Sequence, residues 1–200
     1  MFVRIKKHKD KEYAYIVQNL WTEKGTRQKS RKYLGRVVDF SDKNSTEKTN
    51  YLNSAYESCA VKLKELDFEA IVKKLLEIEL LKLGFKKTEE FIFEKEYNGR
   101  IFNVNLKELC FVSNKKKFVI RNNEGFVCKE TIENLLKTNF EKKESETEQR
   151  NSLIKNLLKN LLEAGLKPEK DVLLLLHDKF LERINSSIVY HQIKENQKNN

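Results

Sequence analysis

The chain has little of the chemistry that marks most catalytic and cofactor-binding sites. Its three cysteines, Cys59, Cys110 and Cys128, lie far apart, and no C-x-x-C pair and no histidine at metal-ligand spacing accompanies them. Neither the G-x-x-x-x-G-K-S/T motif nor the G-x-G-x-x-G motif of phosphate-binding loops occurs. We therefore expect no metal, no cofactor and no enzymatic activity, and we expect the cysteines to be buried thiols in a reducing compartment.

Long apolar segments are also missing. No run approaches the roughly 18 apolar residues that a membrane-spanning helix needs, and the N-terminal FVRIKKHKDK carries charges where a signal peptide would be apolar. With 39% hydrophobic and 35% charged residues, the 200-residue chain is leaner and more charged than an average globular domain. The sequence thus predicts a cytoplasmic protein without a membrane partner, with one substantial core or two small ones.

What the chain does have is positive charge, and the charge is concentrated at one end. The first 36 residues contain eleven Lys and Arg against three acidic residues, a net charge of +8, whereas the whole chain carries +10. Three runs within this segment, FVRIKK, EYAYIVQNLWTEKG and TRQKSRKYLG, have the alternation and turn residues of three short strands. Cations clustered on a small sheet without matching acids indicate a polyanionic partner.

The third run carries its cations at alternate positions. In an extended strand Arg27, Lys29 and Arg31 project from one side, with head groups ~6 to 7 Å apart, close to the repeat between phosphates along a nucleic-acid strand. The register with the second run depends on the turn. A two-residue loop at Lys24-Gly25 would pair Lys29 with Leu20, and a three-residue loop would pair it with Trp21; the sequence leaves both open.

The candidate nucleic-acid contacts are eight of the eleven cations and two aromatic residues of this N-terminal segment. They are Arg4, Lys6, Tyr15, Trp21, Lys24, Arg27, Lys29, Arg31, Lys32 and Arg36. The alternative is a solvated strand face whose Lys and Arg serve only solubility and edge protection. A merely solvated face usually mixes both signs of charge, and this segment does not, which favours a binding surface.

The run KEYAYIVQNLWTEKGTRQKSRKYLGRV resembles the N-terminal segment of insertion-sequence transposases, in which a Tyr-x-Tyr strand, a Gly-containing turn and a basic strand ending in YLG follow one another. Its strand order is also similar to the small DNA-binding sheets of tyrosine recombinases. With NNEGFVCKETIENLL at 122–136 and LLEAGLKPEKDVLLLL at 161–176, the whole chain resembles an uncharacterised archaeal family. The resemblance implies DNA binding and a link to mobile elements, and it carries over no catalytic residue.

We predict an α+β fold: a small N-terminal three-stranded antiparallel sheet, followed by an α+β body with a short antiparallel sheet and a C-terminal helical hairpin. The predicted units are the basic three-stranded module at 1–38, a polar linker at 39–50, the body at 51–190 and a disordered tail at 191–200.

Local signals define the elements of the body. Asp67 is a good N-cap for a helix with a broad apolar stripe, which Gly84 ends. Asn98-Gly99 is the strongest hairpin signal in the chain, and the runs LCFV and KKFVIR predict further strands. Gly165 and Pro168 separate two leucine-rich helices, whose short link predicts an antiparallel pair. Their leucine content suggests a contact with the sheet, a second copy of the chain or a protein partner.

Two function classes follow from the N-terminal charge. The first and favoured one is a non-enzymatic protein that binds duplex DNA through the basic sheet. The second is an RNA- or ribosome-associated protein that uses the same sheet. A protein-interaction module whose basic end is only solubilising is a third, less favoured class.

Overall fold

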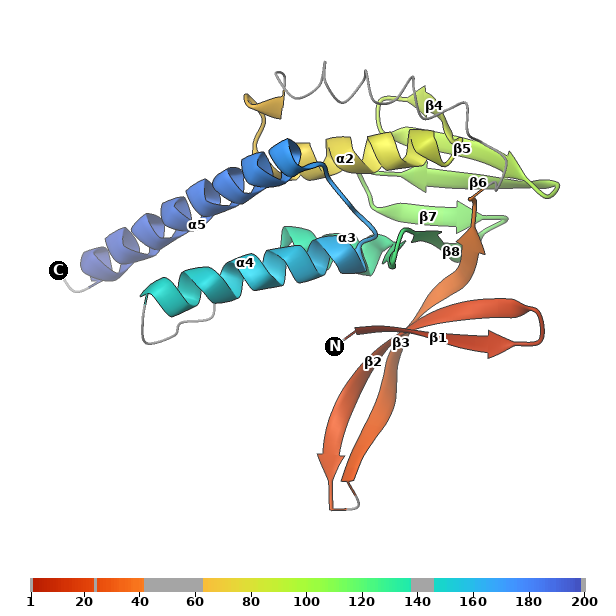
Figure 1. The fold of residues 1–200 in the computed structure, drawn as a ribbon, viewed down its shortest axis with the longest axis horizontal. Helices are drawn as coiled ribbons and strands as arrows, with labels where there is room; N and C mark the ends of the chain where they lie inside the picture. The colour runs from red at the N-terminus through yellow and green to blue at the C-terminus, as the bar shows by residue number, and fades with distance from the viewer. Residues whose placement is uncertain (1, 24, 42–62, 138–145, 199–200) are drawn as a thin grey trace.

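The computed structural model describes residues 2–23, 25–41, 63–137 and 146–198 (Figure 1). Within these residues, nine strands form one mixed sheet in the order β1-β2-β3-β8-β7-β6-β5-β4, with β9 paired to β8. The strands are β1 (Phe2–His8), β2 (Lys11–Thr22), β3 (Gly25–Asp39), β4 (Lys86–Glu89), β5 (Ile92–Tyr97), β6 (Arg100–Asn105), β7 (Cys110–Ser113), β8 (Lys116–Asn122) and β9 (Gly125–Val127). The described helices are α2 (Phe68–Lys82), α3 (Lys129–Leu136), α4 (Glu146–Glu163) and α5 (Lys170–Lys198).

The predicted fold of two small separate sheets is wrong, because β3 joins the N-terminal strands to the body. Its last four residues pair in parallel with β8, from Arg36 opposite Phe118 to Asp39 opposite Arg121. Leu34, Val37 and Val38 near this end of β3 are buried, so the strand is covered on both faces there. The class remains α+β, but the sheet is a single large mixed one.

Phe40, directly after β3, anchors this connection. The sequence reading assigned it to the polar linker, whereas the structure buries its side chain in the larger core. Its ring lies edge-on to three aromatic rings at 5.0–5.2 Å between centroids, those of Phe85, Tyr97 and Phe102. Such edge-to-face contacts are favourable beyond the area they bury. The rest of the predicted linker, residues 42–50, lies outside the described residues.

The predicted helix cap, the Asn98-Gly99 hairpin and the further strands of the body are confirmed. The Asp67 side chain accepts a hydrogen bond from the Ala70 amide at 2.7 Å and caps α2, whose buried stripe forms part of the larger core. Asn98 and Gly99, both with positive φ, form the turn of the β5–β6 hairpin. These features depend on residues close together in the chain, which is why the sequence predicts them well.

The predicted C-terminal helical hairpin is wrong in its packing. α4 packs on α3 and β9, whereas α5 packs on α2, where the rings of Phe68 and Phe180 lie 5.4 Å apart. The link between the helices is fixed to the sheet, because the side-chain amides of Asn122 and Asn123 both donate to the Gly165 carbonyl at 2.8 Å. α4 and α5 therefore pack against different elements of the body. α5 also continues to Lys198, through the segment predicted as a disordered tail.

Gly35 is required where β3 passes β8. Its φ is +147°, which L side chains rarely adopt, and an added Cβ would lie 2.7 Å from the Lys117 carbonyl oxygen. The three nearest atoms, the Lys117 carbonyl oxygen and carbon and the Phe118 Cα, all belong to the backbone, so the clash cannot be relieved by a side-chain rotation.

We therefore expect Gly35→Ala to lower the free energy of unfolding by about 2 to 4 kcal/mol, measured by chemical denaturation. Gly99→Ala is the matched control: its φ of +67° is also unfavourable, but an added Cβ meets nothing within 4 Å, so the loss should be about 1 kcal/mol. Equal losses in the two variants would contradict the close approach of β3 to β8.

Candidate nucleic-acid interface

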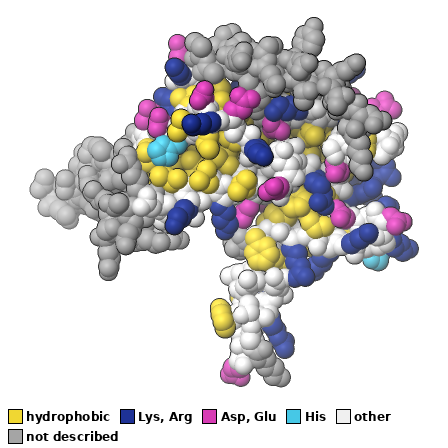
Figure 2. Space-filling model, in the orientation of Figure 1, with side chains coloured by type: hydrophobic (Ala, Val, Ile, Leu, Met, Phe, Trp, Pro, Cys, Tyr) yellow, Lys and Arg dark blue, Asp and Glu magenta, His cyan; other side chains and the backbone are white. Residues whose placement is uncertain are grey.

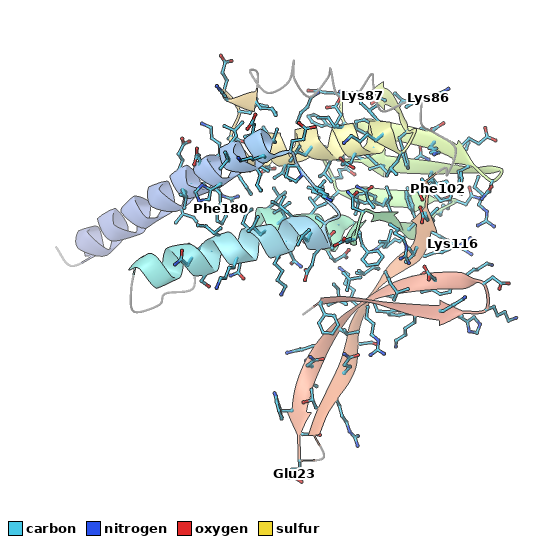
Figure 3. The ribbon with its side chains drawn as sticks, in the orientation of Figure 1. Glu23, Lys86, Lys87, Phe102, Lys116 and Phe180 are labelled. Carbon is cyan, nitrogen blue, oxygen red and sulfur yellow. The ribbon has the colours of Figure 1, made fainter. Side chains whose placement is uncertain are left out.

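The outer halves of β2 and β3 form a two-stranded ribbon that projects from the rest of the molecule (Figure 1). In β3, every residue from Gly25 to Tyr33 is exposed, and beyond Lys32, which pairs with Glu130 of the body, the ribbon extends away from the body to Glu23 at the tip (Figure 3). From Tyr15 to Thr22 the ribbon is eight residues long, and the seven steps between them correspond to a reach of ~23 Å at the usual rise of a strand. It is therefore long enough to contact a partner that does not touch the body.

The turn of the ribbon differs from both predicted loops. Thr22 pairs with Gly25, and the Thr22 hydroxyl donates to the Gly25 carbonyl at 2.7 Å. Gly25 has φ +94° and begins β3 rather than lying inside the loop. Lys24 itself lies outside the described residues.

The register that follows from this turn corrects the predicted partners of Lys29. The structure pairs Lys29 with Gln18, and it pairs Leu20 with Arg27 and Trp21 with Thr26. Neither predicted pairing, with Leu20 or with Trp21, occurs. A turn placed one residue earlier moves every partner along the ribbon, because strand register is set by the turn.

Two register shifts lie at the root of the ribbon, between Ala14 and Tyr15 and between Ile16 and Val17 of β2. At each shift β3 contains one extra residue, Leu34 at the first and Arg31 at the second. Such bulges bend a strand and increase its twist. They occur between the part of β3 that pairs with the body and the part that projects from it.

One side of the ribbon carries the predicted cations. Arg27 and Lys29 lie opposite Leu20 and Gln18, and the Arg31 Nε donates to the Gln18 side chain at 3.0 Å, so all three are on the Gln18 side. We call this the cationic face: Gln18, Leu20, Arg27, Lys29 and Arg31. In the part of the chain that the structure describes, none of these three cations has a carboxylate within ion-pair distance.

The opposite side of the ribbon bears no charge. Asn19 lies opposite Gln28, Trp21 lies opposite Thr26, and all four are exposed. We call these four residues the uncharged face. Trp21 is 87% exposed, the most exposed large hydrophobic side chain in the described chain. Figure 2 shows Lys and Arg side chains along one side of the projecting ribbon and a hydrophobic side chain on the other.

Three predicted contacts, Arg4, Lys6 and Tyr15, meet at the root of the ribbon. Arg4 and Tyr15 are strand partners, and the Lys6 ammonium lies 4.9 Å from the centre of the Tyr15 ring. Lys6 also donates to the Ser30 hydroxyl at 3.0 Å, and the Tyr15 and Tyr33 rings lie 5.4 Å apart. The structure thus adds Tyr33 to this group, on the side of the sheet that continues into the uncharged face.

The remaining two predicted contacts, Lys32 and Arg36, belong to the junction with the body. The Lys32 ammonium lies 2.7 Å from the Glu130 carboxylate of α3, whose hydrogen bond and negative charge raise the pKa of Lys32. Arg36 is half buried where β3 meets β8. Neither is a free cation on the ribbon, and nothing in the local sequence distinguishes them from Arg27 or Lys29.

Two ion pairs of opposite polarity cross the junction between the N-terminal strands and the body. Glu12, one of the three acidic residues of the N-terminal segment, pairs with Arg121 of β8, while Lys32 pairs with Glu130. One cation and one acid of the segment are therefore matched by the body. The positive excess of the N-terminal strands is therefore unchanged by the pairing, and Arg27, Lys29 and Arg31 of the ribbon take no part in it.

An open hollow of about 420 Å³ lies beside this junction, and its lining includes Leu34, Cys110, Phe118, Cys128 and Glu130. Burial raises the pKa of the Cys128 thiol to about 11, so the thiol is neutral at physiological pH. Among the described residues, no group of three or more His, Cys, Asp or Glu side chains is arranged to hold a metal ion. The lining therefore combines apolar side chains with charged ones and the half-buried Cys110 thiol.

No protein-family model, curated protein or solved structure matches the chain. The resemblance to insertion-sequence transposases and to an archaeal family thus stays a prediction.

No helix in the described part of the chain is long and apolar enough to cross a bilayer. Leu158 and Leu162, one turn apart on α4, are exposed, and the predicted contact of these helices with a second copy or a protein partner also stays a prediction.

The buried junction has a measurable consequence for thiol chemistry. In the native protein at pH 8, we expect iodoacetamide to modify Cys128 at least a hundredfold more slowly than in urea, because only the thiolate reacts and the pKa shift alone accounts for about a factor of a hundred. Cys110, which is only half buried, is the internal control and should be modified faster in the native state. Peptide mass spectrometry over time gives both rates, and similar rates in native protein and in urea would contradict a closed junction.

Proposed function

We propose that this protein binds double-stranded DNA, without catalysis, through the projecting β2–β3 ribbon. The observation that carries the proposal is the exposed ribbon with Arg27, Lys29 and Arg31 on one side and no carboxylate beside them among the described residues. Cations that the protein itself leaves unmatched attract a phosphate backbone and release its counterions on binding.

The shape of the ribbon favours duplex DNA over RNA. Two paired strands lie about 4.8 Å apart, so the ribbon with its side chains fits a major groove that is about 12 Å wide. The major groove of A-form RNA is too deep and narrow for protein side chains to read. A projecting ribbon has access to a groove that a flat sheet on the body surface would not enter.

The body gives the ribbon a fixed base. β3 is held by its pairing with β8 and by the buried Phe40, and the Lys32–Glu130 pair links β3 to α3. A ribbon fixed at its root loses less conformational entropy on binding than a free hairpin would. The rigid attachment therefore favours a groove contact with a defined orientation.

The proposal predicts a large electrostatic contribution to binding. We expect the triple variant Arg27→Ala, Lys29→Ala, Arg31→Ala to bind a mixed-sequence 20-base-pair duplex at least about tenfold more weakly at 0.15 M salt. Its plot of log affinity against log salt should be shallower by about 3, because each neutralised phosphate contributes about 0.9 to the slope. Fluorescence anisotropy across a salt series measures both quantities.

The matched control removes three cations from the body: Lys86→Ala, Lys107→Ala and Lys155→Ala. All three are exposed and lie on β4, in the β6–β7 turn and on α4, away from the ribbon. The control loses the same net charge and should keep most of the slope. If both triple variants lose affinity equally, the cationic face is not the binding surface, and tighter binding to structured RNA than to the duplex would favour the RNA alternative.

A further inference from the structure

We infer that the uncharged face of the ribbon enters the major groove and reads A·T base pairs, with Asn19 and Gln28 contacting adenines, while the cationic face turns outward to the flanking phosphates. The inference rests on the proposed function and adds to it an orientation and a base preference.

The first support is the geometry of the two amides. Asn19 and Gln28 are direct cross-strand partners, so their Cβ atoms lie about 5 Å apart on the same face. Both are exposed, and within the described residues neither side chain has a hydrogen-bond partner. Two free amides are thus presented side by side, separated by between one and two base-pair steps of about 3.4 Å.

The second support is the chemistry of an amide. Each carboxamide has one donor group and one acceptor in a planar arrangement, which matches the N6 donor and the N7 acceptor of adenine in the major groove. No other base pair presents that combination to a single amide in the same way. Thr26, beside Gln28 on the face, adds a hydroxyl that bonds to either kind of base edge.

The third support is Trp21, which decides between the two faces. It lies two positions from Asn19 on the same side of β2 and is 87% exposed. If the uncharged face enters the groove, the indole leaves water and can contact the methyl group of a thymine. If the cationic face enters instead, the indole stays in water, and the short amides reach no base at all.

The cations do not need to enter the groove in order to act. Arg and Lys side chains are long and flexible, so they can extend sideways from an outward-facing strand to the phosphates on both edges of the groove. An Asn side chain, by contrast, reaches a base edge only from inside the groove. The cationic face therefore makes the phosphate contacts that position the ribbon, and the uncharged face makes the base contacts that read the sequence.

The test is a selection from a randomised duplex library with the full-length protein, followed by anisotropy measurements on the enriched duplex and on a G·C-only duplex of equal length. We expect the wild type to prefer a site with adjacent A·T pairs by about tenfold or more. Replacing the adenines of that site with 7-deaza-adenine, which lacks the N7 acceptor, should remove most of the preference.

The variant Asn19→Ala, Gln28→Ala should lose the preference while its affinity for the G·C-only duplex and its salt slope stay unchanged. Asn156→Ala is the control, since it removes an exposed amide from α4, away from the ribbon, and should keep the preference. All three residues are at least partly exposed, and circular dichroism checks that the variants fold.

The failure of the inference can be told apart from the failure of the proposed function. Duplex binding with the expected salt slope but with no A·T preference would overturn the inference and leave DNA binding in place. A preference that survives in Asn19→Ala, Gln28→Ala and disappears with the three cations would show that the cationic face reads the bases, and would also overturn it. Absence of duplex binding would overturn both.

Discussion

The structure depends on the attachment of β3 to the body. One strand of fifteen residues has two different parts: its last four residues pair with β8 and bury Val37 and Val38, while its first nine pair with β2 alone and are exposed. Phe40, held among aromatic rings directly after β3, fixes the end of the strand in the larger core. Without this anchor the N-terminal strands would form an isolated small sheet, which is marginally stable by itself in water.

The attachment also determines where the positive charge is available. Lys32 at the junction lies beside Glu130 of α3, whereas Arg27, Lys29 and Arg31 on the ribbon have no carboxylate of the described residues within ion-pair distance. An exposed ion pair contributes little to stability. The distribution of ion pairs thus matters more for binding than for folding, because it leaves the three cations of the cationic face unpaired on the projecting part.

The ribbon has a division of chemistry that a surface-packed strand cannot have. Both of its sides face water, so alternate residues produce two different exposed faces, with Arg27 and Lys29 on one and Asn19 and Gln28 on the other. In the junction the same alternation places Ala14 and Ile16 in the smaller core. Because the ribbon projects from the body, its uncharged face is exposed to a partner and is not covered by the core.

The sequence alone determined what depends on neighbours in the chain: three basic N-terminal strands, the cap of α2 at Asp67, the Asn98-Gly99 hairpin, and the common side of Arg27 and Lys29. Only the tertiary structure decided the parallel pairing of residues 36–39 with 118–121 and the separate partners of α4 and α5. It also decided that Lys32 and Arg36 lie in the junction with the body and not on the ribbon. The physical reason is distance along the chain. Turns, caps and strand alternation are local, whereas a contact between segments about 80 residues apart depends on how the whole core packs.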